Sequence, residues 1–264
     1  MIVDNEKIIP EKRRNEILKL ATDEEVLSMD MLMNRFKTSR STIVRDLKVL
    51  EEKGLVTRTS GGIRIIEGLN YSFDSSRKEQ IEEKREIVKL AYELIKNHST
   101  IVLNSGVTTL ELAKLIAKSD LQIFIVTNSL KIIDYLIINN FVNILSLGGD
   151  FYLPVYAFKG KIPIESMKTL EVNTAFIGVH GIDPEIGVTL PFSEEADLIT
   201  VMMERSKQRV VMADHAKFGR VSLYKVKQNI EDIDIIITDS LTEKKYIDKF
   251  TEKGVQVLIA DVKR

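Results

Sequence analysis

Residues 38–66 read TSRSTIVRDLKVLEEKGLVTRTSGGIRII, and this stretch decides how the amino-terminal part of the chain is interpreted. The apolar side chains of Ile43, Leu47 and Leu50 recur at i, i+4 and i+7, a spacing that predicts a helix ending near residue 53. The opposite side of this helix carries polar residues, namely Ser41, Arg45, Lys48 and Glu52. The pattern therefore predicts a helix with one buried face and one basic, exposed face.

Two shorter helices are expected before this one. The first begins near Glu11, and the second begins after Ser28, a residue type that caps helix amino termini. Behind the third helix, two β-prone runs flank a Ser-Gly-Gly turn at residues 60–62, which predicts a hairpin. This order predicts a winged helix-turn-helix, whose third helix enters the DNA major groove while cations of the hairpin meet phosphates. A helical dimerisation module is the alternative.

The net charge of the chain hides a basic segment. The 264 residues contain 38 Lys and Arg against 39 Asp and Glu, a formal net charge of -1, which by itself argues against a nucleic-acid partner. Residues 35–66, however, contain eight basic and three acidic residues, a local charge of about +5. We expect DNA contacts from Arg35, Arg40, Ser41, Thr42, Arg45, Lys48, Arg58 and Arg64. Symmetric dimers match palindromic DNA, so a homo-oligomer on a double-stranded operator is expected.

Composition excludes several other classes of protein. The chain has no Cys, which rules out disulfides, thiolate nucleophiles and Cys-ligated zinc. No run approaches about 18 apolar residues, so no membrane span is expected. The first residues lack the pattern of a secretory signal, which favours a cytoplasmic protein.

Residues 67–77 lack periodicity and are predicted to link the winged helix of residues 1–66 to a larger domain of residues 78–264. After a long amphipathic helix over 78–97, apolar and β-branched runs alternate with helical patterns. The predicted strands are 100–103, 122–127, 142–147, 174–179, 209–213, 233–238 and 255–259. The predicted helices between and after them are 108–118, 129–139, 164–170, 193–206 and 242–253. This alternation predicts an α/β domain with a Rossmann-like, doubly wound, mostly parallel sheet.

Polar and glycine-containing turns follow most of these strands. In parallel sheets such turns meet at one edge, where ligands bind. The first turn, Asn104-Ser105-Gly106, opens a helix whose free N–H groups can hold a phosphate. We therefore expect a small-molecule site at this edge, although any one turn alone is better explained as an ordinary turn or helix cap than as a ligand contact.

Together these motifs resemble the DeoR family of bacterial transcription regulators. The first part of the resemblance is Ser39-Arg40-Ser41-Thr42-Ile43-Val44-Arg45-Asp46-Leu47, followed by the Gly61-Gly62 turn. The second part is Gly106-Val107-Thr108-Thr109, Val126-Thr127-Asn128, Gly148-Gly149, Gly181-Ile182-Asp183, Glu195-Ala196 and Lys217-Phe218-Gly219.

The resemblance implies a fold like that of ribose-phosphate isomerases and a phosphorylated sugar as effector. The effector contacts that it implies are Asn104, Ser105, Gly106, Thr108, Thr109, Asn128, Gly148, Gly149, Tyr152, His180, Gly181, Asp183, Glu195, Asp214 and Lys217.

The chain departs from the family pattern at five positions. Val44 replaces an arginine of the DNA-binding motif, and the other four departures fall in the effector motifs, at Asn104, Val107, Tyr152 and Ile199. Tyr152 and Ile199 replace an arginine and a lysine, so two cations that could meet a phosphate are absent. Lys217, Lys159 and the helix amino terminus could still hold an anion. A less charged effector, a larger one or none is the rival expectation.

An enzyme with an isomerase-like fold is the alternative of another class, with Glu195, Asp183, Asp214 and Lys217 as an acid/base set. A structural DNA-binding protein is a third alternative, but it would not need the converging turns. We favour a regulator, most simply a repressor, with no catalytic residues, no cofactor and no metal ligands. His180 and His215 are expected to be site or loop residues, because three His and no Cys give zinc little support.

Overall fold

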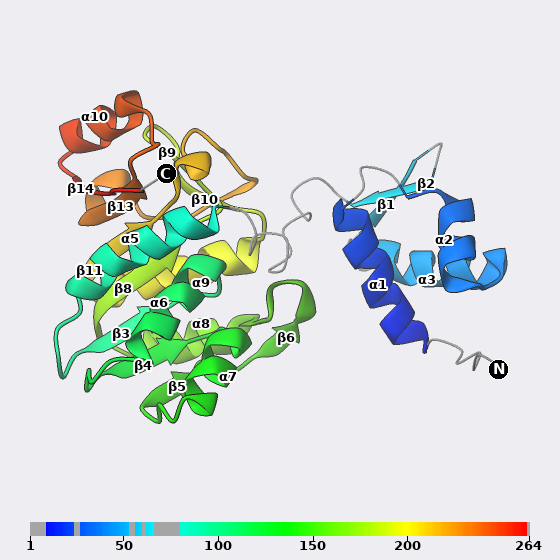
Figure 1. Ribbon diagram of the computed structural model, residues 1–264, viewed down its shortest axis with the longest axis horizontal. Coiled ribbons are helices and arrows are strands. Elements are labelled where there is room, and N and C mark those ends of the chain that lie inside the picture. The colour runs from blue at the N-terminus through cyan, green and yellow to red at the C-terminus, as the bar shows by residue number, and fades with distance from the viewer. Residues whose placement is uncertain (1–8, 24–26, 53–55, 60–61, 66–79, 263–264) are drawn as a thin grey trace. The chain divides into compact units, whose positions relative to one another are not determined.

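The computed structural model describes residues 9–23, 27–52, 56–59, 62–65 and 80–262 (Figure 1). The chain divides into two compact units, Met1–Ser75 and Ser76–Arg264. The predicted linker, residues 67–77, lies outside the described residues. Among the helices that are described, none has the length and apolar character needed to cross a membrane.

The described residues of the first unit form three helices and a hairpin, as predicted. The elements are α1 (Pro10–Asp23), α2 (Met29–Phe36), α3 (Arg40–Glu52), β1 (Val56–Thr59) and β2 (Gly62–Ile65). The hydroxyl of Ser28 accepts a hydrogen bond from the N–H of Met31 at 3.2 Å, which confirms the predicted cap of α2. The core of this unit includes Ile17, Leu32, Ile43, Leu47, Leu50 and Val56.

A β-bridge between the segment before α2 and strand β2 connects the hairpin to the helices. Leu27 and Ile63 exchange two backbone hydrogen bonds of 2.9 Å, so the segment before α2 pairs with β2. Gly62 is required there, because a Cβ at this position would lie 2.0 Å from the carbonyl oxygen of Leu27. This contact holds the hairpin against the core of the unit, to which Val56 and Ile63 contribute.

The second unit is built on a seven-stranded sheet, in which every strand pair is parallel. Its strands are β3 (Thr100–Leu103), β4 (Phe124–Thr127), β5 (Ile144–Ser146), β8 (Val172–Gly178), β11 (Ser206–Met212), β13 (Ile235–Asp239) and β14 (Gln256–Ala260). The spatial order is β14-β13-β11-β8-β3-β4-β5. Successive strands are added from β3 toward β5 on one side and from β8 toward β14 on the other. The strand order therefore reverses between β3 and β8, and ligands are expected to bind at that point.

Helices cover both faces of this sheet, as a doubly wound fold requires. The helices are α5 (Ile81–Glu93), α6 (Val107–Ile116), α7 (Leu130–Ile138), α8 (Lys161–Lys168), α9 (Ser193–Glu204) and α10 (Lys244–Glu252). Helix α6 packs against α5 and α7, whereas α8 packs against α9. In β8, Ala175 and Ile177 share a core with Met202 of α9, while Phe176 between them is buried on the opposite face of the strand.

The sequence did not predict two small antiparallel additions. The strands β6 (Asp150–Tyr152) and β7 (Ala157–Lys159) form a hairpin after β5. The strands β9 (Gly181–Asp183), β10 (Gly187–Leu190) and β12 (Tyr224–Lys225) form a three-stranded sheet. Each of these strands has two to four residues, too few to show a period in the sequence.

Candidate DNA-binding surface and effector site

The exposed face of α3 carries the residues predicted to contact DNA. Arg40, Ser41, Arg45 and Lys48 are exposed, and Thr42 is half-buried. Arg35, in the last turn of α2, is exposed as well. The hydroxyl of Ser39 accepts a hydrogen bond from the N–H of Thr42 at 3.3 Å and lies 2.9 Å from the hydroxyls of Ser41 and Thr42. This cap orders the first turn of α3, where a recognition helix meets base edges.

A buried ion pair that the sequence analysis missed fixes the orientation of α3. Asp46 lies on the buried side of the helix, with its Oδ2 atom 2.6 Å from Nε of Arg13 and its Oδ1 atom 3.3 Å from Nη1 of Arg14. Both arginines belong to α1. An acid three positions after the buried Ile43 was the available signal, because an acid on an apolar face requires a cation.

The remaining predicted DNA contacts belong to the hairpin. The backbones of Arg58 and Arg64 are paired with those of Ile63 and Thr57, respectively. Both arginine side chains lie outside the described part of the structure, so their contact with DNA stays a prediction.

Asn104 joins β3 to β8, the two strands between which the strand order reverses. Its side chain donates to the carbonyl oxygen of Gly178 at 2.8 Å and accepts from the N–H of the same residue at 2.9 Å. Thr109 donates to the carbonyl oxygens of Asn104 at 2.7 Å and Gly106 at 3.1 Å. These bonds tie the ends of β3 and β8 together and hold the turn, with Ser105, Gly106 and Thr108, at the start of α6.

Glu195, in the first turn of α9, is buried next to this turn. The hydroxyl of Ser105 donates to its Oε1 atom at 3.4 Å, while Oε2 is buried without a hydrogen-bond partner among the described residues. Burial raises the pKa of the Glu195 carboxyl, and the positive charge of Lys159 acts in the opposite direction. The structure thus brings the predicted Ser105 and Glu195 together.

The β6–β7 hairpin contributes the ammonium of Lys159 and the aromatic ring of Tyr152 to this region. The Nζ atom of Lys159 lies 4.0 Å from the ring centroid of Tyr152 and 3.6 Å from that of Phe192. Burial lowers the pKa of the Lys159 ammonium, and the carboxylates of Glu195 and Glu194 oppose that shift. Burial, followed by the same two carboxylates, raises the pKa of Tyr152 to about 12. Phe192 was not predicted, because a lone aromatic residue before a helix has no distinctive pattern.

Asn128, at the end of β4, faces the same hairpin. Its side-chain amide donates to the carbonyl oxygen of Phe158 at 3.1 Å, and its Oδ1 atom is buried without a partner in the described structure. Gly149 lies directly against β7, because a Cβ there would lie 2.6 Å from the carbonyl oxygen of Lys159. Gly148, which has a φ of +66°, turns the chain into this position.

His180 follows the end of β8, and Lys217 lies in the short helix His215–Lys217 that follows β11. The Nδ1 atom of His180 is 2.8 Å from the hydroxyl of Ser222. Burial, followed by the positive charges of Arg220 and Lys217, lowers the pKa of His180 to about 3, so the imidazole is neutral at physiological pH. Gly181 permits the chain to cross closely, because a Cβ there would lie 2.2 Å from the carbonyl oxygen of Arg220.

The carboxylates of Asp183 and Asp214, both predicted effector contacts, have partners within the protein. Asp183 accepts hydrogen bonds of 2.8 and 3.1 Å from the N–H groups of Glu185 and Ile186, and so closes the turn between β9 and β10. Asp214 caps the short helix at His215–Lys217 by accepting from the N–H of Ala216 at 3.2 Å. That either carboxylate contacts an effector stays a prediction.

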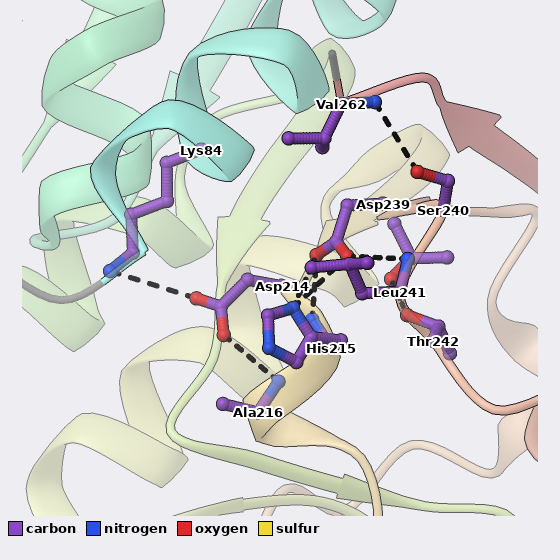
Figure 2. A network of polar contacts seen from close by, with 10 residues as sticks. Lys84, Asp214, His215, Ala216, Asp239, Ser240, Leu241, Thr242 and Val262 are labelled. Carbon is purple, nitrogen blue, oxygen red and sulfur yellow. Dashed lines mark hydrogen bonds and ion pairs between the residues drawn. The ribbon is translucent and has the colours of Figure 1, made fainter. Parts of the chain in front are cut away.

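Figure 2 shows the network around Asp214. Its Oδ2 atom lies 3.6 Å from Nζ of Lys84, in the first turn of α5. The neighbouring His215 donates its backbone N–H to Asp239 at 2.7 Å and places its Nδ1 atom 3.0 Å from the same carboxylate. Asp239 also accepts from the N–H of Leu241 at 3.0 Å. Within the described residues, no cluster of His, Asp and Glu that could hold a metal ion is present.

Comparisons with known proteins agree with both parts of this description. The model of the DeoR-like helix-turn-helix domain matches residues 13–68, and that of the DeoR C-terminal sensor domain matches residues 79–240. The chain is 30% identical over 255 residues to an HTH-type transcriptional regulator of Haemophilus influenzae, covering 96% of this chain and 98% of that protein. It is also 30% identical over 253 residues to the HTH-type transcriptional repressor GlcR of Bacillus subtilis, covering 95% and 96%.

Among solved structures, ribose 5-phosphate isomerase A of Methanocaldococcus jannaschii matches 53% of this chain and 55% of that chain, with 14% identity and a TM-score of 0.40. That score carries no functional argument. The family models, in contrast, cover most of the chain, and their boundary falls between the two compact units. The chain therefore belongs to the DeoR family of transcription regulators.

Proposed function

We propose that this chain is a repressor whose affinity for a double-stranded DNA operator is changed by a phosphorylated sugar. In this proposal residues 1–66 bind DNA, residues 67–77 connect the units, and residues 78–264 bind the effector and form a homo-oligomer. The relative in Bacillus subtilis that is named a repressor supports the sign of regulation. A regulator of this kind works where the chromosome is, which in bacteria is the cytoplasm.

The observation that carries the effector proposal is a pair of buried acceptors without donors. Asn128 Oδ1 and Glu195 Oε2 have no hydrogen-bond partner among the described residues, and each lies in a turn or helix start at the carboxyl edge of the sheet. A buried polar group without a partner costs about 1–3 kcal/mol, so these two atoms favour a ligand that donates hydrogen bonds. Sugar hydroxyls are such donors.

The same edge also favours an anion. Lys217 is only 5% exposed, and its ammonium forms no hydrogen bond or ion pair with the described residues. The first turn of α6 begins at Gly106 without a side-chain cap, and free N–H groups at a helix start attract anions. A phosphorylated sugar would satisfy the acceptors with its hydroxyls, and its phosphate would be attracted by the positive charges at this edge.

An isomerase is less well supported by the same residues. Ile199 is a buried apolar residue of α9, so it supplies no charge where the family pattern has a lysine. Asp214 already caps a helix and faces Lys84, which leaves it poorly placed to act as a free base.

Four measurements test the proposal. A panel of sugar phosphates, with the corresponding neutral sugars as controls, is added to the full chain, and the melting temperature is measured. At least one sugar phosphate should raise it and should change affinity for a DNA site selected by the protein from a random pool. No response at millimolar ligand would exclude a sugar-phosphate effector, and turnover of ribose 5-phosphate would contradict the regulator-only assignment. Analytical ultracentrifugation tests the homo-oligomer.

A further inference from the structure

We propose that Lys159 binds the anionic group of the effector, while Glu195 beside it accepts a hydrogen bond from a hydroxyl close to that group. The two side chains would then recognise one chemical feature, an oxyanion on a hydroxylated carbon chain. This inference rests on the proposed function, because it names the chemistry of that same site. It assigns the anion to a lysine outside the family motifs of this chain.

The first argument is the surroundings of the Lys159 ammonium. The residue is 9% exposed, and its Nζ atom lies over the rings of Tyr152 and Phe192. Aromatic faces attract a cation, but an ammonium has three N–H donors that require acceptors. Among the described residues, none forms a hydrogen bond or an ion pair with this ammonium. The rings therefore hold a dehydrated cation in place without satisfying its donors.

The second argument is the separation between Lys159 and Glu195. Each group shifts the pKa of the other toward its charged form, so the two charges are close. No ion pair within 4.0 Å joins them, however, among the interactions of the described residues. Two buried, opposite charges that influence each other without forming an ion pair can each bind a different group of one ligand. An oxyanion would accept from the ammonium and a hydroxyl would donate to Glu195 Oε2, which lacks a partner.

The third argument is the position of Lys159 in the β6–β7 hairpin. Tyr152 pairs with Ala157 in the β6–β7 hairpin, and Asp150 pairs with Lys159. Because directly paired residues share a face and alternate residues do too, Tyr152 and Lys159 lie on the same face of the hairpin. The family pattern has an arginine at the position of Tyr152 in β6. In this chain Lys159 of β7 thus places a cation beside that position.

A phosphate monoester and a carboxylate both present an oxyanion, so the experiment includes both. The full-length protein is titrated with sugar phosphates, with sugar acids of the same chain length and with the neutral sugars, and binding is measured by calorimetry. The variants are Lys159→Met, which keeps the length of the side chain without its charge, and Lys159→Arg, which keeps the charge. Lys161→Met is the matched control, because Lys161 is an exposed lysine two residues further on.

We expect Lys159→Met to weaken binding of the anionic ligand by about tenfold or more, and Lys159→Arg to restore much of it. The neutral sugars should bind the wild type and Lys159→Met equally weakly, and Lys161→Met should behave as the wild type does. Whether sugar phosphates or sugar acids show the loss identifies the anion.

The melting temperature of the ligand-free protein separates this role from a structural one. If Lys159 only neutralised Glu195, Lys159→Met would lower that temperature. A binding residue with an unsatisfied ammonium should instead leave it unchanged or raised, because a dehydrated charge is removed. Unchanged ligand affinity in Lys159→Met would overturn the inference and leave the proposed function intact. A wild type that binds no member of the panel would overturn both.

Discussion

The ammonium of Lys84 lies 3.6 Å from the carboxylate of Asp214, and the two side chains are 3% and 1% exposed (Figure 2). This contact joins α5 to the turn after β11. Helix α5 is the first described element that follows the DNA-binding unit in the chain, and the turn after β11 contains Lys217 of the proposed effector site. The pair therefore connects the beginning of the sensor unit to the edge of the sheet where we propose that the effector binds.

Lys84→Met should destabilise the sensor unit by about 3 kcal/mol, because the substitution leaves the Asp214 carboxylate buried beside an apolar side chain. Lys89→Met is the control: Lys89 lies on the same helix, is exposed and pairs only locally with Glu86, so its loss should cost less than about 0.5 kcal/mol. Hydrogen exchange of the amides of α5 and β11 in the full chain measures both effects. Equal exchange in the two variants would show that the buried pair contributes no net stability.

Arg45→Ala should weaken binding to a selected DNA site by roughly 1–3 kcal/mol if Arg45 contacts a base. Lys12→Ala removes an equal charge from an exposed position of α1 and should produce only the smaller, sequence-independent loss. Binding is measured by fluorescence anisotropy on the selected site and on a scrambled one. If Arg45→Ala weakens both DNAs equally, Arg45 contacts phosphate; if it weakens neither, it does not contact DNA.

Asp46→Asn should loosen α3 without changing its exposed face. The substitution leaves Arg13 and Arg14 facing a neutral amide, and breaking a buried pair costs about 3 kcal/mol, so α3 amides should exchange on the order of a hundred times faster. Asp30→Asn, at an exposed position in the first turn of α2, should have little effect. DNA affinity should fall with Asp46→Asn although Asp46 lies away from the DNA-facing surface.

The stability of the protein should fall in mild acid because of His180. Its pKa is about 3 in the folded protein against an ordinary value of 6.5, so the unfolded chain binds a proton between these values and the folded chain does not. Its contribution is therefore complete above about pH 6.5 and is lost as the pH falls toward 3, at roughly 1.4 kcal/mol per pH unit. Urea denaturation at pH 7.5, 6.5 and 5.5 should show a shallower decline for His180→Gln than for the wild type. His98→Gln, which removes an imidazole from an exposed position, is the matched control.

Gly149→Ala should cost more stability than Gly254→Ala, although both glycines have a positive φ. A Cβ at Gly149 would lie 2.6 Å from the carbonyl oxygen of Lys159 and 2.7 Å from Cδ of Pro163, whereas a Cβ at Gly254 would meet nothing within 4 Å. Gly254→Ala should therefore cost about 1–2 kcal/mol from the backbone conformation alone. Gly149→Ala adds displacement of β7, so it should also weaken ligand binding. Similar losses in both variants would contradict the close approach.

Periodic segments could be predicted from the sequence because their period records which face is buried. Ile43, Leu47 and Leu50 showed the buried face of α3 directly, and the structure buries all three. The seven parallel strands were found because each contains a run of apolar residues, although the edge strands β5 and β14 are only partly buried. The hairpin β6–β7 escaped prediction because its pairing depends on contacts between segments, such as Gly149 with Lys159, that no local pattern records.

The sequence by itself determined that a basic helix-turn-helix precedes an α/β domain and that polar turns follow its strands. Only the tertiary structure decided which of those polar groups have partners. It joins Asn104 to Gly178, Asp183 to its own turn and Asp214 to Lys84, while it leaves Glu195 Oε2 without one. It also brings the ammonium of Lys159 to the rings of Tyr152 and Phe192. The physical reason is that a side chain's partners and hydration depend on residues far away in the chain, and these become neighbours only on folding.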